Sequence, residues 1–99
     1  MRIEIGMDKY SQGGKEFFSL YGYPSDGGVM AGNYGDTVDV AASQIIAAAS
    51  EHGEKSVLVR DSVHCTRPLK GYEMKLLMEG LKGNGLGIEF TYKEFGQQP

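Results

Sequence analysis

The sequence is poor in cysteine: Cys65 is the single one among 99 residues. One cysteine excludes a disulfide bond within the chain, which favours a reducing compartment such as the cytoplasm. No apolar stretch approaches the roughly 20 residues that a membrane-spanning helix needs. Met1 and Arg2 lead directly into an alternating strand pattern. We therefore expect neither a membrane helix nor a signal peptide.

Positive charge is also sparse. Ten basic residues against thirteen acidic ones give a net charge of −3. A nucleic-acid-binding protein usually carries a basic patch, and the densest basic stretch here holds only Arg60, Arg67 and Lys70. No Gly-rich phosphate-binding loop with its lysine and following helix is present. The composition therefore disfavours nucleic acid as a partner.

What the sequence does contain is the pattern of a small globular chain. The hydrophobic fraction of 40% is typical of a folded protein, and the length predicts a single domain over residues 1–99. Apolar and polar side chains alternate from Arg2 to Tyr10, which predicts a strand with one wet face. Further strands are predicted over 15–23 and 29–33, separated by Gly-rich turns. The first third therefore reads as an antiparallel meander.

The rest of the chain alternates between helix and strand patterns. Asp36 is the expected N-cap of a first helix, and Asp39 adds an acid to the first turn. A short buried strand follows over 57–59. Pro68 opens a second helix, and alternation over 86–92 predicts the last strand.

The predicted order is therefore βββαβαβ, an α/β (α+β) fold. Right-handed crossovers make the last two strands parallel. We predict a mixed five-stranded sheet with two helices on one face and no cover from this chain on the other. An uncovered face that carries aromatic side chains favours self-association, so we expect a homodimer.

The loop from Arg60 to Arg67 concentrates the reactive side chains of the chain. If the strand before it is parallel to a neighbour, the loop lies at the carboxyl end of that strand, where open α/β sheets bind ligands. The flanking arginines suit carboxylate or phosphate groups. Surface charge and an ordinary loop cysteine are the alternatives. We predict a site for a small anion or a partner protein, formed by Arg60, Asp61, Ser62, His64, Cys65 and Arg67.

Three acids carry a first family resemblance. Asp8 ends the first predicted strand, Asp39 lies in the first helix, and Asp61 ends the fourth strand. Over roughly residues 1–95 this layout resembles the ribonuclease H-like fold, whose nucleases place acids at these points. The resemblance implies that the acids bind two divalent metal ions, which activate water and stabilise the leaving oxygen. The alternative is that Asp39 is a helix-start acid and Asp8 merely ends a strand.

A second resemblance covers residues 57–81. The segment 57–64 is similar to the strand and Asp-Ser-His ligand loop of zinc-dependent D-aminopeptidases, and 78–81 is similar to a later stretch of them. This resemblance implies zinc-dependent hydrolysis. His52 and His64 are the two histidines of the chain, too few with one cysteine for a closed zinc site.

The residues favour a small soluble non-enzymatic binding or interaction protein. Alternation places Asp8 on the strand face away from the helices, where it does not meet Asp39. We therefore predict no catalytic residue, no metal ligand and no cofactor. The alternative is a metal-dependent hydrolase or nuclease that uses Asp8, Asp39 and Asp61, or a thiol enzyme that uses His64 and Cys65.

Overall fold

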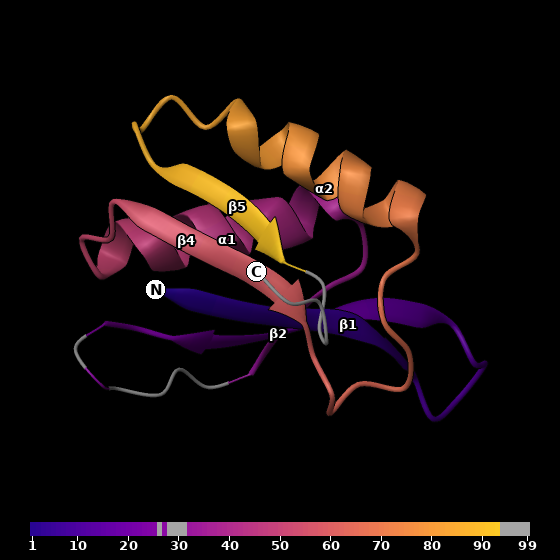
Figure 1. Ribbon diagram of the computed structural model, residues 1–99. Coiled ribbons are helices and arrows are strands. Elements are labelled where there is room, and N and C mark those ends of the chain that lie inside the picture. Colours follow the sequence, from indigo (N-terminus) through magenta and orange to yellow (C-terminus); the bar gives the residue numbers. More distant parts are fainter. Residues whose placement is uncertain (26, 28–31, 94–99) are drawn as a thin grey trace.

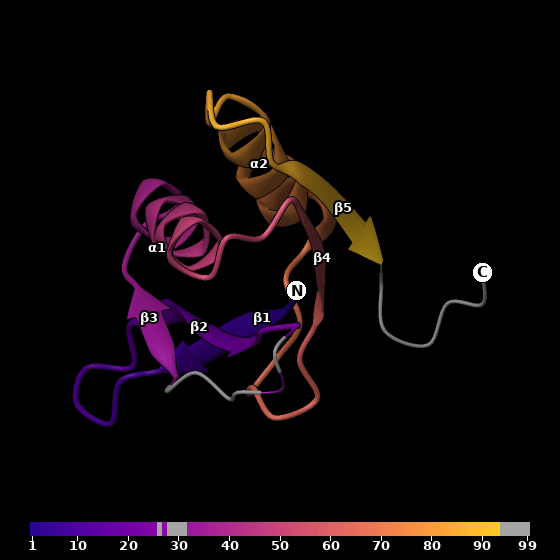
Figure 2. The same ribbon diagram turned by 90° about the vertical axis from the view of Figure 1, so that its left-hand side faces the viewer.

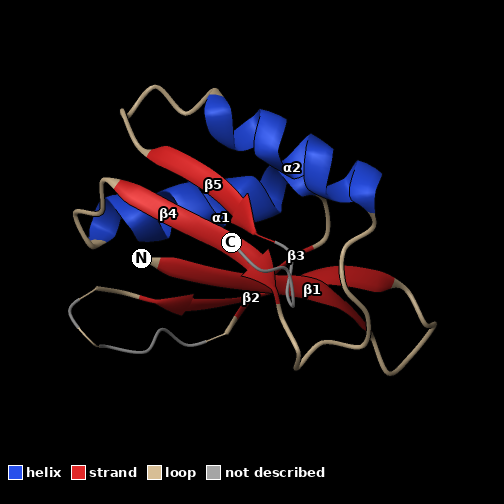
Figure 3. Cartoon of the chain, in the orientation of Figure 1, coloured by secondary structure: helices blue, strands red, loops and turns tan. Residues whose placement is uncertain are grey.

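Five strands and two helices alternate in the order βββαβαβ in the computed structural model, which describes residues 1–25, 27 and 32–93 (Figures 1 and 3). The elements are β1 (Arg2–Lys9), β2 (Glu16–Tyr23), β3 (Asn33–Gly35), α1 (Val38–Glu51), β4 (Ser56–Asp61), α2 (Gly71–Lys82) and β5 (Glu89–Lys93). This order confirms the predicted α/β (α+β) fold class. Within the described ranges, neither helix is long and apolar enough to pass through a membrane.

The strands form one mixed sheet in the order β3-β2-β1-β4-β5. β1, β2 and β3 are antiparallel neighbours, whereas β4 is parallel to both β1 and β5. Both helices lie on the same side of this sheet (Figure 2). The prediction of a mixed five-stranded sheet with two helices on one face is therefore confirmed.

The core lies between the sheet and the helices. Alternation turns Ile3 and Ile5 of β1 toward the helices, where their exposed fractions are 2% and 0%. Small side chains on α1 allow a close approach to the sheet. A Cβ atom added at Gly35 of β3 would lie 2.8 Å from the backbone nitrogen of Ala41, so only glycine fits this crossing.

α1 begins one residue later than the sequence predicts. The N-cap is Thr37, whose hydroxyl accepts from the N–H of Val40 at 3.3 Å. Asp36 accepts a hydrogen bond from the hydroxyl of Tyr10 at 2.6 Å instead. Asp36 therefore fastens the end of β3 to the hairpin between β1 and β2.

α2 begins at Gly71, three residues after Pro68. Lys70 is extended, with φ −73° and ψ 158°, and therefore stands outside the helix. The carboxylate of Glu73 accepts the N–H of Lys70 at 2.7 Å and caps the first turn. Proline thus marks the end of the preceding loop rather than the start of the helix.

The bounds of the two edge strands, β3 and β5, differ from those predicted. The structure has β3 at Asn33–Gly35, and most of the predicted strand 29–33 lies outside the described residues. β5 begins at Glu89 rather than at Leu86. The Leu86 N–H donates to the side chain of Asn84 at 2.6 Å, which holds this segment in a turn.

The sheet face opposite the helices is not free of cover, which corrects the prediction. The chain that leaves β4 swings to this side of the sheet before it rises to α2 (Figure 2). Cys65 of this segment lies over Gly6 of β1. The segment then returns to the edge of β1, where the backbone of Arg67 pairs with that of Met7 through N–H···O bonds of 2.8 and 3.1 Å. We call residues 62–67 the crossing loop. We call the side of the sheet opposite the helices the open face, although the crossing loop covers part of it.

Candidate active site at the ends of β1 and β4

The carboxyl ends of β1, β4 and β5 meet at one edge of the sheet, because these strands are parallel. Each helix must return the chain to the opposite edge before the next parallel strand, so both helices begin at this same edge (Figure 1). In open α/β sheets this is the edge at which ligands bind. The crossing loop lies here, as the sequence predicts.

Asp61 is the last residue of β4 and faces the helices. Its exposed fraction is 6%, and the hydroxyl of Tyr92 on β5 lies 3.3 and 3.4 Å from its two carboxylate oxygens. A carboxylate that is nearly buried needs such polar partners to offset its lost hydration. Asp61 also borders an open hollow of about 380 Å³, which is lined further by Ser62, Val63, Cys65, Thr66, Arg67 and Pro68.

Asp8 lies near the end of β1 on the open face. Its Oδ1 atom accepts two hydrogen bonds from Thr66, one from the backbone N–H at 2.8 Å and one from the hydroxyl at 3.0 Å. The carboxylate therefore fastens the crossing loop to β1. This contact gives Asp8 a structural role in the described conformation.

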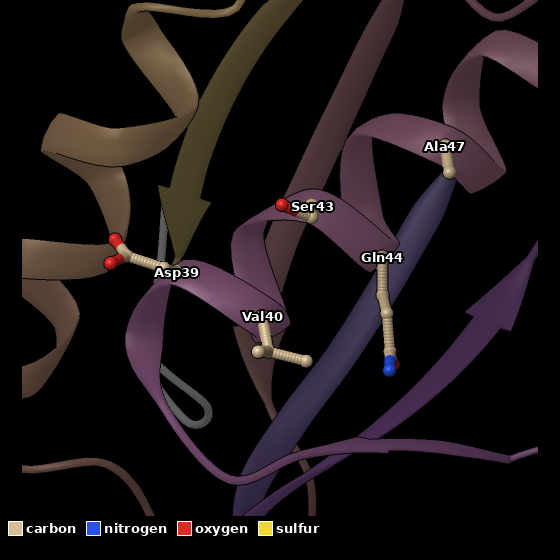
Figure 4. A pocket seen from close by; sticks show the side chains of 5 residues that line it. All are labelled: Asp39, Val40, Ser43, Gln44 and Ala47. Carbon is tan, nitrogen blue, oxygen red and sulfur yellow. The ribbon is translucent and has the colours of Figure 1, made fainter.

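Asp39 lies in the first turn of α1 and is exposed. It lines a shallow hollow on the outer side of the helix together with Val40, Ser43, Gln44 and Ala47. Figure 4 shows the Asp39 carboxylate pointing away from Val40 and Gln44. An acid here also suits the partial positive charge of the helix N-terminus.

Arg67, the last residue of the crossing loop, forms ion pairs with two carboxylates. Its guanidinium donates to both oxygens of Glu16 at 2.7 and 3.0 Å, and to both oxygens of Glu73 at 2.9 and 3.0 Å. These hydrogen bonds raise the pKa of Arg67 and hold the pKa of each glutamate below its ordinary value. Arg67 thus ties the loop to β2 and α2, and we call these three residues the clamp.

The middle of the crossing loop is packed against β1. Ser62 is buried, and its backbone N–H donates to the carbonyl of Ile5 at 3.0 Å. Cys65 lies directly over Gly6, where an added Cβ would approach the Cys65 Cβ to 2.5 Å. Burial raises the pKa of the Cys65 thiol, which disfavours the thiolate that a nucleophile needs.

Arg60 and His64 both lie on the open face of the sheet. The exposed His64 ring meets the ring of Tyr21 edge-on at 6.4 Å. Arg60 is the neighbour of Glu4 in the register of β4 and β1. The predicted binding residues therefore divide between the hollow at Asp61, the clamp and the open face. Their binding role stays a prediction.

The three acids do not form one ion-binding cluster. Among the residues that the structure describes, no three histidine, cysteine, aspartate or glutamate side chains are placed to hold a metal ion. Strand parity is the cause, because Asp61 pairs with Ile5 and faces the helices while Asp8 faces the other way. The arrangement does not fit the two-ion centre that the resemblance implies, so we derive no step through a metal.

Two contacts at this edge were not predicted from the sequence. Tyr92 contacts Asp61, and Thr66 holds Asp8. Alternation in the last strand places Tyr92 on the helix side and Thr91 on the other. The sequence therefore indicates that Tyr92 and Asp61 face the same way. No pattern in the sequence indicates that Thr66 folds back across β1.

Solved structures place this chain in a known fold. The N-terminal ribonuclease H domain of a Mycobacterium tuberculosis protein, solved as a fusion with maltose-binding protein, superposes with a TM-score of 0.50 at 13% identity. The match covers 98% of this chain and 86% of that one. No protein-family model matches the sequence, and no curated protein is significantly similar to it.

Weaker matches include RuvC of Thermus thermophilus and a ribonuclease H of the archaeon Halobacterium salinarum. RuvC has a TM-score of 0.48 at 9% identity, over 93% of this chain and 63% of that one. The archaeal enzyme has a TM-score of 0.47 at 14% identity, over 95% of this chain and 85% of that one. The fold is ribonuclease H-like, as the first resemblance predicts, and the resemblance to zinc-dependent D-aminopeptidases gains no support.

The fold overturns the functional prediction. A non-enzymatic binding protein for which nucleic acid is disfavoured is wrong, because the matched structure is a ribonuclease H domain. The homodimer and the small-anion ligand were parts of that prediction and are not proposed again. Net charge averages over the whole chain and says nothing of where its cations lie, so it does not exclude nucleic acid as a partner.

Proposed function

We propose that the chain acts on nucleic acid as a phosphodiester hydrolase, with Asp61 at the centre of its site. The observation that carries the proposal is the position of Asp61 at the end of a central parallel strand. Its carboxylate is nearly buried and borders the hollow of about 380 Å³ beneath the crossing loop. The ribonuclease H-like fold supports hydrolysis as the reaction class.

The carboxylate of Asp61 is suited to proton transfer. A general base must lie within hydrogen-bond reach of the water that it activates. The Tyr92 hydroxyl contacts the carboxylate, and Asp61 also lines the hollow. Asp39 and Asp8 are the further acids of the same edge. Both hydrogen bonds from Thr66 go to Oδ1 of Asp8, so the Oδ2 atom of Asp8 is not used in that contact.

The predicted binding residues receive separate roles in this proposal. Ser62 and Cys65 line the hollow, and His64 contacts the substrate where it leaves the hollow. Arg60 attracts the backbone of the nucleic acid. Arg67 is a positioning residue, because its guanidinium is engaged by the two glutamates of the clamp. We place the activity of this single domain, residues 1–99, in the cytoplasm.

The test is a cleavage assay with labelled single-stranded, duplex and hybrid substrates. Each is run with EDTA, with Mg²⁺ and with Mn²⁺, so that any metal requirement is measured rather than assumed. Asp61→Asn is expected to lower the rate about 100-fold or more, as for loss of a general base. Glu79→Gln is the matched control, because it makes the same acid-to-amide change on the exposed surface of α2.

The variants also separate the acids from one another. If Asp39→Asn or Asp8→Asn lowers the rate as much as Asp61→Asn, the three acids act together despite their separate contacts. Circular dichroism must show that every variant is folded. A folded wild-type chain that cleaves none of the substrates under any of these conditions would contradict the proposal.

A further inference from the structure

Three aromatic rings gather on the open face near the end of β1. The register pairs Phe17 with Asp8 and Tyr34 with Ser19, which places both rings on this face. The ring centroids of Tyr10 and Phe17 are 4.5 Å apart, and those of Phe17 and Tyr34 are 5.9 Å apart. Tyr34 is 57% exposed and Tyr10 is 36% exposed. The cluster therefore presents aromatic surface to solvent.

A second aromatic group lies farther along β2 on the same face. Tyr21 and Tyr23 alternate with the buried Leu20 and Gly22, which turn the other way. His64 meets the ring of Tyr21, and the guanidinium of Arg2 lies 4.3 Å from the centroid of Tyr23. This face therefore carries aromatic rings at both ends of β2, with the buried Ser19 between them.

Cations lie on the same face as the rings. Arg60 of β4 and Lys93 of β5 are neighbours in the register, and Arg2 of β1 faces the same way. The acid Glu4 lies among these cations, and its Oε2 atom is 3.2 Å from Nε of Arg2. The carboxylates of Asp8 and Asp36 accept hydrogen bonds from within the chain. Cations thus share this face with acids, and the guanidinium of Arg2 lies over the ring of Tyr23.

We propose that the open face binds single-stranded nucleic acid. Aromatic rings stack on unpaired bases without regard to sequence, and nearby cations hold the backbone phosphates. Bases within a duplex are already stacked and cannot lie flat on these rings. The inference rests on the proposed function for the class of polymer, and it adds a binding surface separate from Asp61.

The crossing loop joins this surface to the candidate active site. Cys65 covers Gly6 on the open face and also lines the hollow beside Asp61. His64, one residue before it, contacts Tyr21. A strand that lies along the rings of β2 therefore passes the loop and reaches the hollow where β4 ends.

Binding is measured with the full chain in EDTA, where cleavage is not needed. The probes are labelled oligothymidine, alone and annealed to its complement. The chain has six tyrosines and no tryptophan, so its intrinsic fluorescence comes from tyrosine. Bases that stack on the rings quench this fluorescence, whereas purely electrostatic binding leaves it nearly unchanged. We expect the single strand to bind, to quench, and to bind more tightly than the duplex.

Substitutions then locate the site. Tyr34→Ala is expected to weaken binding about tenfold, as for loss of one stacked base, while Tyr34→Phe retains affinity. Tyr72→Ala is the matched control, because Tyr72 is 63% exposed on α2, away from the open face. Arg2→Gln is expected to reduce the dependence of affinity on salt. Equal affinity of Tyr34→Ala and wild type, or a loss with Tyr72→Ala, would overturn the proposal.

Light scattering on the same samples tests the competing occupant, a second copy of the chain. A wild-type dimer that Tyr34→Ala converts to a monomer, with no binding of oligothymidine, would overturn the inference. Its failure and that of the hydrolase proposal are distinguishable. Binding and quenching without cleavage support the surface and not the enzyme, whereas cleavage with unchanged affinity in Tyr34→Ala supports the enzyme and not the surface.

Discussion

The two faces of the sheet differ in what determines their residues. On the helix side, Ile3, Ile5, Val57 and Val59 are at most 2% exposed. On the open face, β1 and β4 carry charged side chains, and β2 and β3 carry partly exposed rings, such as Tyr34 at 57%. Packing against helices accounts for the first set, since apolar burial drives folding. The second set is less buried, so packing constrains the sequence of the open face less than that of the helix side.

The largest expected effect comes from the helix side. Ile5→Ala should lower the free energy of unfolding by about 2–5 kcal/mol, because the side chain is fully buried and leaves a cavity. Tyr34→Ala should cost less than about 1 kcal/mol, as for exposed positions away from special features. Urea unfolding followed by far-UV circular dichroism measures both. Equal losses would mean that the open face is packed in solution and would break the comparison.

This difference also explains what the sequence could predict. Alternation in β1 and β5 revealed which side chains face the helices, because burial imposes a period of two. The same rule correctly turned Asp8 away from the helices. Element order and right-handed crossovers then defined the sheet, since few topologies satisfy both. Contacts that repeat with a fixed period are therefore readable from one sequence.

The crossing loop was not readable in this way. Its path depends on the bridge between Arg67 and Met7 and on the absence of a side chain at Gly6. These contacts join positions about 60 residues apart and occur once, so they leave no periodic signal. The loop was predicted as a site from its composition. Its composition could not reveal that Arg67 is engaged by glutamates or that Thr66 holds Asp8.

The next effect concerns Gly6, where the open face is tightly packed. A Cβ at Gly6 would lie 2.5 Å from the Cys65 Cβ. Gly6 does not have a positive φ, so this close contact is the reason that an alanine does not fit. Gly6→Ala should therefore displace the crossing loop and destabilise the fold by about 1–3 kcal/mol. Faster hydrogen exchange at the Thr66 amide should accompany the loss, because its bond to Asp8 is broken.

Gly71→Ala provides the control for this substitution. Gly71 is the first residue of α2 and has no atom within 4 Å of an added Cβ. The change should leave the stability unchanged or raise it by up to about 1 kcal/mol, because alanine favours helix. If Gly6→Ala behaved like Gly71→Ala, the crossing loop would not be packed on β1 in solution.

A smaller effect is expected at the clamp, which connects the crossing loop to α2. Glu73→Gln keeps the shape of the side chain but removes its charge beside Arg67, and should cost about 1 kcal/mol near neutral pH. The hydrogen bonds from Arg67 lower the pKa of Glu73 from its ordinary value of 4.5. The stabilisation is therefore complete above 4.5 and is lost as the pH falls through the lowered pKa.

The urea concentration at the midpoint of unfolding, measured from neutral pH to well below pH 4.5, tests the direction of this pH dependence. The wild type should lose more stability over that range than Glu73→Gln does, since the variant has already lost the charge. Glu16 keeps part of the acid sensitivity in both proteins, because Arg67 also lowers its pKa. A variant that loses stability with acid as steeply as wild type would show that Arg67 does not pair with Glu73.

The smallest effect is a titration on the open face. The hydrogen bond to Asp36 raises the pKa of Tyr10 from 10.0 to about 12, because ionisation would place two negative charges 2.6 Å apart. Asp36→Asn should return this pKa toward 10.0. Ultraviolet absorbance of tyrosinate reports the shift, and Tyr10→Phe identifies which of the tyrosine titrations belongs to Tyr10. A stacking surface needs its rings held in place, and an unshifted Tyr10 would mean that this ring is not.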